Sequence, residues 1–479
     1  MLNLLTKTLS LVFVVFGVSM IPPLGISIAT EDGHGITYLV LLVVALALGL
    51  PAFVFKFPGS RTPRIRDGFI IVTMTWLGIC SLGALPFVII SGLDPASALF
   101  ESASGFTTTG STTIVDLDLL PRSLLFYRQQ IQWVGGIGVI VLAIALLPML
   151  GIGGMDVLKA ETTGPAKSDK LRPRLKHTAQ AMWGIYFFIT VMCALMYWLA
   201  GMPVFDAIAH SLSTVSTGGF STHDESMAYY ASPGIEAVAI LFMLLGATSF
   251  VLHYRAWAQR SVKPYGTNTE AKLFIASILV FSAVIAIFLA AKAGDTSLHS
   301  MRLSVFEVVS VITSTGFGVA DFTTWPLMLP TLLIFVSFVG GCSGSTAGGM
   351  KVIRFALMGK QAGIELARLV HPRMVRPLKL NGVVVPGTVI QSVWAFFTVY
   401  LVVFAMLMLV LMWLGLDQVS AFGAIATCLN NLGPGLGEVA NNFATVTPSV
   451  KLVCALACIM GRLEIFTIFV LCTPTYWRA

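Results

Sequence analysis

Ten long apolar runs, separated by shorter polar stretches, organise this chain. Each run is close to the ~20 residues that a helix needs to cross a bilayer, so the pattern predicts ten spanning helices. The first run could be mistaken for a secretory signal, but it continues to Ile28 without a clean small-residue cleavage site, and we interpret it as the first span. The runs cover residues 3–28, 38–57, 69–91, 127–150, 181–201, 234–257, 271–293, 331–357, 388–414 and 449–473.

The composition agrees with a membrane protein. The 479 residues are 56% hydrophobic and 11% charged, with a mean hydropathy of +0.88, whereas soluble proteins carry about 25% charged residues. An integral membrane protein in a lipid bilayer is therefore expected.

The net charge of +7 is distributed in a way that indicates topology and not nucleic-acid binding. Basic residues gather in alternate loops, within 56–66, 159–176, 255–272 and 351–379. By the positive-inside rule these loops and both termini face the cytoplasm. A cytosolic partner docking on 167–177 and on 351–379 is an alternative use of the same charge.

No catalytic signature is found in the sequence. It has no HExxH, no nucleophile elbow and no Walker lysine after a Gly-rich loop. Its seven cysteines form no CxxC pair, and Cys454 and Cys458 are interpreted as packing within a span. We expect neither an enzyme nor a tightly bound cofactor.

Four loops on the side opposite the basic loops share one pattern, with a period of about a hundred residues. In each, a short apolar segment leads into a polar run that contains glycine. We aligned them on Gly110, Gly218, Gly316 and Leu432, the last of which departs from glycine. The segments are PASALFESASGFTTTGST (95–112), PVFDAIAHSLSTVSTGGFST (203–222), RLSVFEVVSVITSTGFGV (302–319) and QVSAFGAIATCLNNLGPG (418–435).

Such loops suit a cation pathway. Lipid cannot satisfy non-helical backbone, which must therefore be buried in protein or line a wet cavity. Four related loops can surround one axis, and their carbonyl and hydroxyl oxygens can replace the water shell of a small cation. Glycine permits the dihedral angles that successive inward-pointing carbonyls require. Short re-entrant helices would direct their negative C-terminal ends at the same axis.

The four loops, the ten spans and the C-terminal TPTYWRA resemble the TrkH branch of the Trk/Ktr/HKT superfamily of potassium transporters. The resemblance implies an all-α integral membrane fold: four fused pore-loop repeats around a central pore, each of helix, re-entrant helix, filter and helix, plus two extra N-terminal transmembrane helices. The corresponding boundaries are 1–60 for the helix pair and 61–160, 161–265, 266–375 and 376–479 for the repeats.

The resemblance also implies a function. It implies potassium uptake across the bacterial inner membrane, by a homodimer with one pore in each protomer and a TrkA-like cytosolic nucleotide-binding ring as regulator. K⁺ is then the transported ion, bound at a filter shorter than that of K⁺ channels. The implied filter residues are Thr108, Thr109, Gly110, Ser216, Thr217, Gly218, Ser314, Thr315, Gly316, Asn430, Asn431, Leu432 and Gly433.

The eighth apolar run is interrupted by GGCSGSTAGG. Such a run of small residues disfavours a continuous helix, since each glycine costs about 1 kcal/mol relative to alanine. In the family the matching stretch obstructs the pore, so it is predicted to be a gate; close helix packing through small residues is the alternative. The predicted gate residues are Gly340, Gly341, Ser343, Gly344, Ser345, Thr346, Gly348 and Gly349.

Arg462 stands inside the last apolar run, where a charge is costly and by default marks a pathway. On the pore axis it would set a barrier to cations, as the matching family arginine implies. A structural pair with a carboxylate or carbonyls of another repeat is the alternative. Glu464, two residues later, is expected on a different side of the same helix.

Other polar residues near the re-entrant segments are expected to have supporting roles. Glu101, Asp206 and Glu307 are predicted to support the helices, with cation attraction as the alternative. His210 and His223 flank the second loop and are predicted to be hydrogen-bonded structural groups.

An alternating-access K⁺/H⁺ or K⁺/Na⁺ symporter is the competing mechanism. That class usually shows two inverted halves with helices broken at the midplane, whereas four parallel repeats on one side favour a pore.

Overall fold

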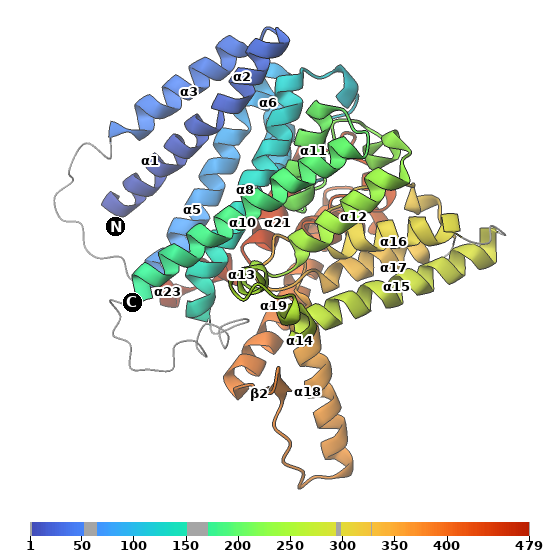
Figure 1. The fold of residues 1–479 in the computed structure, drawn as a ribbon. Coiled ribbons are helices and arrows are strands. Elements are labelled where there is room, and N and C mark those ends of the chain that lie inside the picture. The colour runs from blue at the N-terminus through green and yellow to red at the C-terminus, as the bar shows by residue number, and fades with distance from the viewer. Residues whose placement is uncertain (1, 52–64, 151–170, 294–297, 327, 479) are drawn as a thin grey trace.

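The computed structural model describes residues 2–51, 65–150, 171–293, 298–326 and 328–478. The regular secondary structure of the described chain is helical apart from one small antiparallel hairpin of β1 (Lys379–Leu380) and β2 (Val383–Val384) (Figure 1). The predicted boundaries at 60/61 and 160/161 lie outside the described residues, as do several of the basic residues in the first two cytoplasmic loops.

Three helices precede a recurring pattern: α1 (Leu2–Ser19), α2 (Ile21–Thr30) and α3 (Gly35–Gly49). One order of elements then recurs four times: a long helix, a short helix, an extended segment and a further helix. We call the four repeats of this order units one to four. Unit one comprises α5 (Ile65–Gly83), α6 (Leu85–Ile90), α7 (Pro95–Phe106) and α8 (Arg122–Leu150). Unit two comprises α10 (Leu171–Leu199), α11 (Val204–Val215), α12 (Pro233–Ala247) and α13 (Phe250–Ala258).

Units three and four repeat the order. Unit three comprises α15 (Thr269–Ala293), α16 (Leu298–Ile312), α17 (Leu329–Val339) and α18 (Val352–Val370). Unit four comprises α19 (Gly387–Trp413), α20 (Gln418–Asn430), α21 (Pro448–Arg462) and α22 (Phe466–Cys472). Two short helices, α14 (Lys263–Thr267) and α23 (Pro474–Arg478), complete the α-helical elements of the described chain, and α18 projects with the hairpin from one end of the body (Figure 1).

Several helices are long and apolar enough to span a membrane. By length and composition, five stretches of the described residues meet this condition, and seven do if each of two bent helix pairs is one span. An all-helical protein with several spans is thus confirmed, and the number ten stays a prediction. The five stretches are Thr6–Thr30, Asp67–Ile90, Thr178–Leu199, Thr269–Ala291 and Gly387–Trp413.

The predicted interruption of the eighth run is confirmed, because α17 ends at Val339 and α18 begins at Val352. Two other runs were predicted as continuous spans, and this prediction is wrong. The run 234–257 bends by 93° between α12 and α13, and the run 449–473 bends by 108° between α21 and α22. Of the four units, only the first therefore keeps an unbroken last helix, α8.

The first of these bends has a tertiary cause. The carbonyls of Gly246 and Ala247, at the end of α12, accept hydrogen bonds from the backbone N–H groups of Thr346 and Cys342, at 3.2 and 2.9 Å. The N–H of Phe250, at the start of α13, donates to the carbonyl of Gly344 at 3.0 Å. The segment that interrupts unit three thus satisfies the helix ends left open by the break in unit two.

Helix packing closes the four units into a circle. The last helix of each unit packs against the short helix of the next: α8 against α11, α12 against α16, and α17 against α20. The circle is completed by α21 of unit four, which packs against α7 of unit one. Residues far apart in sequence are thereby brought to one centre.

Candidate functional site

Four extended segments meet at this centre, and they share one backbone conformation. In each, a non-glycine residue has a positive φ and a glycine with positive φ follows two residues later. The first residues are Thr108, Thr217, Ser314 and Asn431, with φ between 52° and 54°. The glycines are Gly110, Gly219, Gly316 and Gly433, with φ of 85°, 79°, 80° and 109°. We call the four segments 108–110, 217–219, 314–316 and 431–433 the central ring.

This conformation corrects the sequence alignment in two of the four loops. Gly219, and not Gly218, corresponds to Gly110, and Gly433, and not Leu432, completes the set. The fourth loop therefore has its glycine at the shared position and does not depart from the others. The sequence shift arose because Gly218 and Gly219 are adjacent and only backbone geometry separates them.

The short helices end identically, which confirms the corrected alignment. In each, the N–H of the residue before the ring glycine donates to the carbonyl five residues earlier, a bond typical of a Schellman helix end. The helix C-termini therefore face the ring, with their negative dipole ends toward it. The bonds are Thr109 to Ser104, Gly218 to Ser213 and Thr315 to Ser310, each 2.8 Å, and Leu432 to Thr427, 2.9 Å.

Each ring glycine faces a carbonyl of the next unit. A methyl group built on Gly110 would lie 2.2 Å from the carbonyl oxygen of Gly218. A methyl group built on Gly219 would lie 1.8 Å from the carbonyl oxygen of Thr315. One built on Gly316 would lie 2.1 Å from the carbonyl oxygen of Leu432. On Gly433 it lies 3.1 Å from the carbonyl oxygen of Thr109, so the ring closes from unit four to unit one. Only glycine permits such an approach at positive φ.

Two predicted filter residues lie just outside the ring. The hydroxyl of Ser216 donates to the carbonyl of Leu212 at 2.8 Å, within its own helix. The amide of Asn430 accepts from the Tyr400 hydroxyl at 2.7 Å and donates to Ser337 at 2.8 Å. The other predicted filter residues fall within the ring segments, and Gly219 is the ring residue that the prediction missed.

The polar residues of the short helices hold the chain as it leaves the ring. Glu307 accepts hydrogen bonds from the N–H groups of Val319 and Ala320, at 2.9 and 3.3 Å. Glu101 accepts from the N–H of Thr113 at 2.8 Å, and Asp206 accepts from the Thr222 hydroxyl at 2.8 Å. The predicted support of the helices is therefore corrected: these three side chains hold the loops that follow the ring.

Helix capping falls instead to residues that the sequence analysis did not name. Asp94 caps α7 by accepting from the N–H groups of Ala96 and Ser97, and Asp417 caps α20 in the same way.

The histidines have hydrogen-bonded positions, as predicted. His210 lies at the position of Glu101 and Glu307 in unit two, and its Nε2 lies 3.0 Å from the Ser221 hydroxyl. His223 Nδ1 lies 2.5 Å from Asp118. Within the described residues, no cluster of three His, Cys, Asp or Glu side chains could hold a metal ion.

An outer cavity of about 530 Å³ lies beside the ring and is rich in acidic side chains. It reaches Gly316 at the ring and Glu307 on the adjacent helix. Carboxylates that line a cleft raise the local concentration of cations. The acidic side chains in its lining are Asp224, Glu225, Glu307 and Asp321.

The predicted gate residues form a loop against the other face of the ring. We call residues 340–349 the Gly-rich loop. The N–H of Gly348 donates to the Ser314 hydroxyl, and the N–H of Gly349 donates to the carbonyl of Asn430 at 2.9 Å. The hydroxyls of Thr346 and Thr217 lie 3.2 Å apart. The loop thus contacts units two, three and four at their ring segments or one residue before them.

Arg462 is brought to the same loop. It is the last residue of α21, is buried, and donates from Nη1 to the carbonyl oxygen of Thr346 at 2.7 Å. Its Nε and Nη2 are buried without a hydrogen-bond partner among the described residues. The pairing with a carbonyl of another unit, foreseen as an alternative, is therefore present.

Glu464 was expected on another side of a continuous helix, but the helix ends at Arg462. Glu464 has a φ of 56° in the bend before α22 and accepts from Nη2 of Arg354 at 2.5 Å. The guanidinium of Arg354 also lies over the Phe396 ring, 4.0 Å from its centroid. This pair joins α18, which follows the Gly-rich loop, to the bend in unit four.

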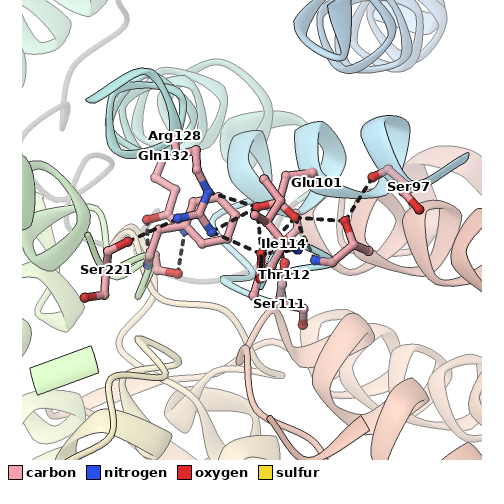
Figure 2. A network of polar contacts seen from close by, with 12 residues as sticks. Ser97, Glu101, Ser111, Thr112, Ile114, Arg128, Gln132 and Ser221 are labelled. Atoms are coloured by element: carbon pink, nitrogen blue, oxygen red, sulfur yellow. Dashed lines mark hydrogen bonds and ion pairs between the residues drawn. The ribbon is translucent and has the colours of Figure 1, made fainter. Parts of the chain in front are cut away.

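Two functional candidates behind the ring escaped the sequence analysis. Arg128 and Gln132, on α8, are buried and bonded to the ring segment and following loop of unit two (Figure 2). The signal was present: an arginine and three glutamines (RQQIQ) interrupt an otherwise apolar run, and polar groups at that depth are by default functional.

Comparisons with known proteins identify the family. The family described as a cation transport protein, TrkH, matches residues 41–478. The Trk system potassium uptake protein TrkH of Vibrio parahaemolyticus is 45% identical over 99% of this chain and 99% of its own length. That of Escherichia coli is 43% identical over the same shares, and the Trk system potassium uptake protein TrkG of Escherichia coli is 38% identical over 97% and 96%.

A solved structure agrees. The crystal structure of the potassium transporter TrkH from Vibrio parahaemolyticus is similar with a TM-score of 0.90, at 42% identity and over 100% of both chains. The resemblance inferred from the four loops is confirmed, as are a multi-pass membrane protein and a transport function in place of an enzymatic one. The chain therefore belongs to the TrkH family of cation transport proteins.

Proposed function

We propose that this protein takes up potassium across the bacterial inner membrane, through a pore whose selective part is the central ring. One observation carries the proposal: four glycines, one from each unit, each face a carbonyl of the next unit in an unbroken circle. Carbonyl oxygens arranged about one axis can replace the hydration shell of an alkali cation. The relatives are potassium uptake proteins by name, which supports K⁺ as the ion.

Thr109, Gly218, Thr315 and Leu432 supply the four carbonyls of this layer in the proposal. Their side chains do not contribute to it, so a leucine in unit four is compatible with the same role as the threonines. The four helix C-termini add negative potential at the same point. The acidic outer cavity then serves as the entrance.

The four units correspond to the four repeats, with boundaries near 61–160, 161–265, 266–375 and 376–479 and the N-terminal helix pair before them. The circular packing of each last helix on the next short helix supports a central pore lined by all four repeats. The last helix bends in units two and four and is interrupted in unit three, and the non-helical segment of unit three contacts the ring.

The Gly-rich loop is the gate in this proposal. Arg462 holds this loop in place through its hydrogen bond and repels cations through its charge. The loop lies against the ring, and the guanidinium is bonded to the loop with two further N–H positions buried beside it. Opening then requires the loop to leave the ring. By the positive-inside rule, the basic loops predict that the face carrying the Gly-rich loop and both termini lie in the cytoplasm.

Assembly is proposed on the same family basis. The relatives are named as parts of a Trk system, which supports a further component. On the family resemblance, the proposal includes a homodimer regulated by a TrkA-like nucleotide-binding ring. The projecting α18 and its hairpin, on the Gly-rich-loop side, offer a surface for that ring (Figure 1).

Flux of ⁸⁶Rb⁺ into proteoliposomes tests the proposal. We expect flux down the gradient, blocked by K⁺ more strongly than by Na⁺, at rates above those of an alternating-access cycle. Gly316→Ser should reduce the preference for K⁺ over Na⁺, because its side chain would meet the carbonyl of Leu432. Gly318→Ser is the matched control, since the nearest atom to its added Cβ lies 3.9 Å away. Absence of ⁸⁶Rb⁺ flux, or slow saturating exchange that requires H⁺ or Na⁺, would overturn the proposal.

A further inference from the structure

A buried arginine on α8 joins the first two units behind the ring. The side chains of Arg128 and Glu101 are 1% and 0% exposed. Arg128 Nε donates to Glu101 at 3.0 Å, Nη2 donates to the Thr112 hydroxyl at 3.1 Å, and Nη1 donates to the carbonyl of Ser221 at 3.1 Å. The guanidinium also lies over the Phe220 ring, 4.2 Å from its centroid. One side chain therefore contacts the short helix and loop of unit one and the loop of unit two (Figure 2).

One turn along α8, Gln132 contacts the ring itself. Its Nε2 donates to the carbonyl of Gly218 at 2.6 Å, and its Oε1 accepts from the N–H of Phe220 at 3.0 Å. The carbonyl of Gly218 is one of the four that face a ring glycine. Both ends of this amide are thus bonded to unit two, on either side of Gly219.

Units two and four lack this pair at the matching positions. The helices α8, α12 and α21 can be aligned by one shared contact. In each, a glycine (Gly135, Gly246 or Gly461) lies against the carbonyl of the residue four positions before the ring glycine of its unit. In α8, Arg128 and Gln132 lie seven and three residues before Gly135. The same offsets before Gly246 and Gly461 give the matching positions in the other two helices. In α12 and α21 these positions hold Ala239 with Met243 and Cys454 with Cys458.

The charge of Arg128 is neutralised where it lies, because Glu101 is its direct partner. A buried ion pair contributes little net stability over an apolar pair of similar volume. What the guanidinium adds is geometry, since its planar fork holds three acceptors in fixed directions. A lysine would keep the charge and lose this arrangement.

We propose that Arg128 and Gln132 are positioning residues that fix the distance between the ring segments of units one and two, and thereby set the preference of the ring for K⁺ over Na⁺. This proposal rests on the proposed function. A ring that discriminates cations must resist contraction around the smaller ion. Between units one and two, the side chains of Arg128 and Gln132 resist this contraction through their hydrogen bonds to both units.

The test compares variants in the ⁸⁶Rb⁺ assay, with K⁺ and Na⁺ as competitors. Arg128→Lys and Gln132→Met should each lower the K⁺/Na⁺ ratio by about tenfold, which corresponds to about 1.4 kcal/mol, while cation flux persists. Arg122→Lys and Gln130→Met, on the same helix, are the controls: Arg122 is exposed, and Gln130 instead donates to the carbonyl of Ser19. Both should keep the ratio.

Thermal unfolding in detergent separates positioning from folding. If the single variants fail to fold, the double variant Glu101→Leu with Arg128→Met removes the pair without leaving one buried charge, and it should fold with a lowered ratio. An unchanged ratio in folded Arg128→Lys and Gln132→Met, or failure of all three to fold, would overturn the inference. Absence of ⁸⁶Rb⁺ flux in the unmodified protein would overturn the proposed function instead.

Discussion

Nη1 of Arg462 lies 2.7 Å from the carbonyl oxygen of Thr346, so that the guanidinium at the end of α21 is bonded to the Gly-rich loop. Arg462 is buried, and Glu464, the nearest acid in sequence, is engaged with Arg354. The charge is therefore held by a loop carbonyl beside the ring. In the proposed function, both the restraint on the Gly-rich loop and the barrier to cations follow from this contact.

Arg462→Met should raise basal ⁸⁶Rb⁺ flux. The substitution removes a hydrogen bond from a charged donor, worth about 1.5–3 kcal/mol, and also removes the positive charge from the proposed path of the ion. We expect flux to rise about tenfold or more without any cytosolic partner. Arg368→Met is the control, because Arg368 lies in an exposed ion pair with Glu365. Equal flux in the two variants would contradict the role of Arg462.

The corrected ring alignment predicts opposite tolerance at two adjacent glycines. Gly219→Ala should abolish selective flux, because φ is 79° and the new methyl group would lie 1.8 Å from the carbonyl oxygen of Thr315. Gly218→Ala meets instead the end of the Gln132 side chain at 2.4 Å, which can move, and should retain flux with a weakened preference for K⁺.

Gly201→Ala separates the steric effect from backbone strain. Gly201 has a φ of 100° with no other atom within 4 Å of an added Cβ, so this variant carries the strain of positive φ alone. It should keep the K⁺/Na⁺ ratio and lose only about 1–2 kcal/mol of stability, measured by thermal unfolding. If Gly218→Ala abolished flux while Gly219→Ala retained it, the original sequence alignment would be restored.

The sequence predicted an all-helical protein with several spans, the four loops and the break at Gly340, because each follows from local composition. The bends after Ala247 and Arg462 were not predictable in this way. The first depends on hydrogen bonds from the Gly-rich loop, about a hundred residues later. The ring alignment failed for a similar reason: Gly218 and Gly219 differ only in φ, which the closure of the circle determines.

Arg354 and Glu464 connect the Gly-rich loop to the bend in unit four, since Arg354 is three residues into α18 and Glu464 precedes α22. The side chain of Arg354 is 5% exposed and that of Glu464 is 33% exposed. Removing one partner of a largely buried pair costs about 3–5 kcal/mol. Arg354→Met should therefore lower the thermal unfolding midpoint and raise basal ⁸⁶Rb⁺ flux, because α18 is released from the bend that precedes α22.

A charge-reversed pair provides the control for this prediction. Arg354→Glu combined with Glu464→Arg should recover part of the unfolding midpoint relative to Arg354→Glu alone. Failure of the double variant to recover any stability would mean that the contact of Arg354 with Phe396, 4.0 Å from the ring centroid, carries the effect.

The cap of α7 gives the protein a pH-dependent contribution to stability. Asp94 accepts hydrogen bonds from the Ser97 hydroxyl and from the N–H groups of Ser97 and Ala96, and the pKa of this carboxyl is lowered, chiefly by the Ser97 hydroxyl. Because the pKa of Asp94 is lower in the folded state, the ionised carboxylate stabilises the fold at any pH above the unfolded-state pKa of about 3.9. This contribution is lost as the pH falls through the folded-state pKa.

Asp94→Ala should accordingly cost about 1 kcal/mol at pH 7, and the gap from the unmodified protein should close as the pH falls below about 4. Thermal unfolding in detergent across this range measures both. Asp417→Ala, at the equivalent cap of α20, should change the midpoint in the same direction, whereas Glu438→Ala, at an exposed acid, should change the midpoint little. A gap for Asp94→Ala that persists in acid would assign the effect to packing of the side chain and not to its charge.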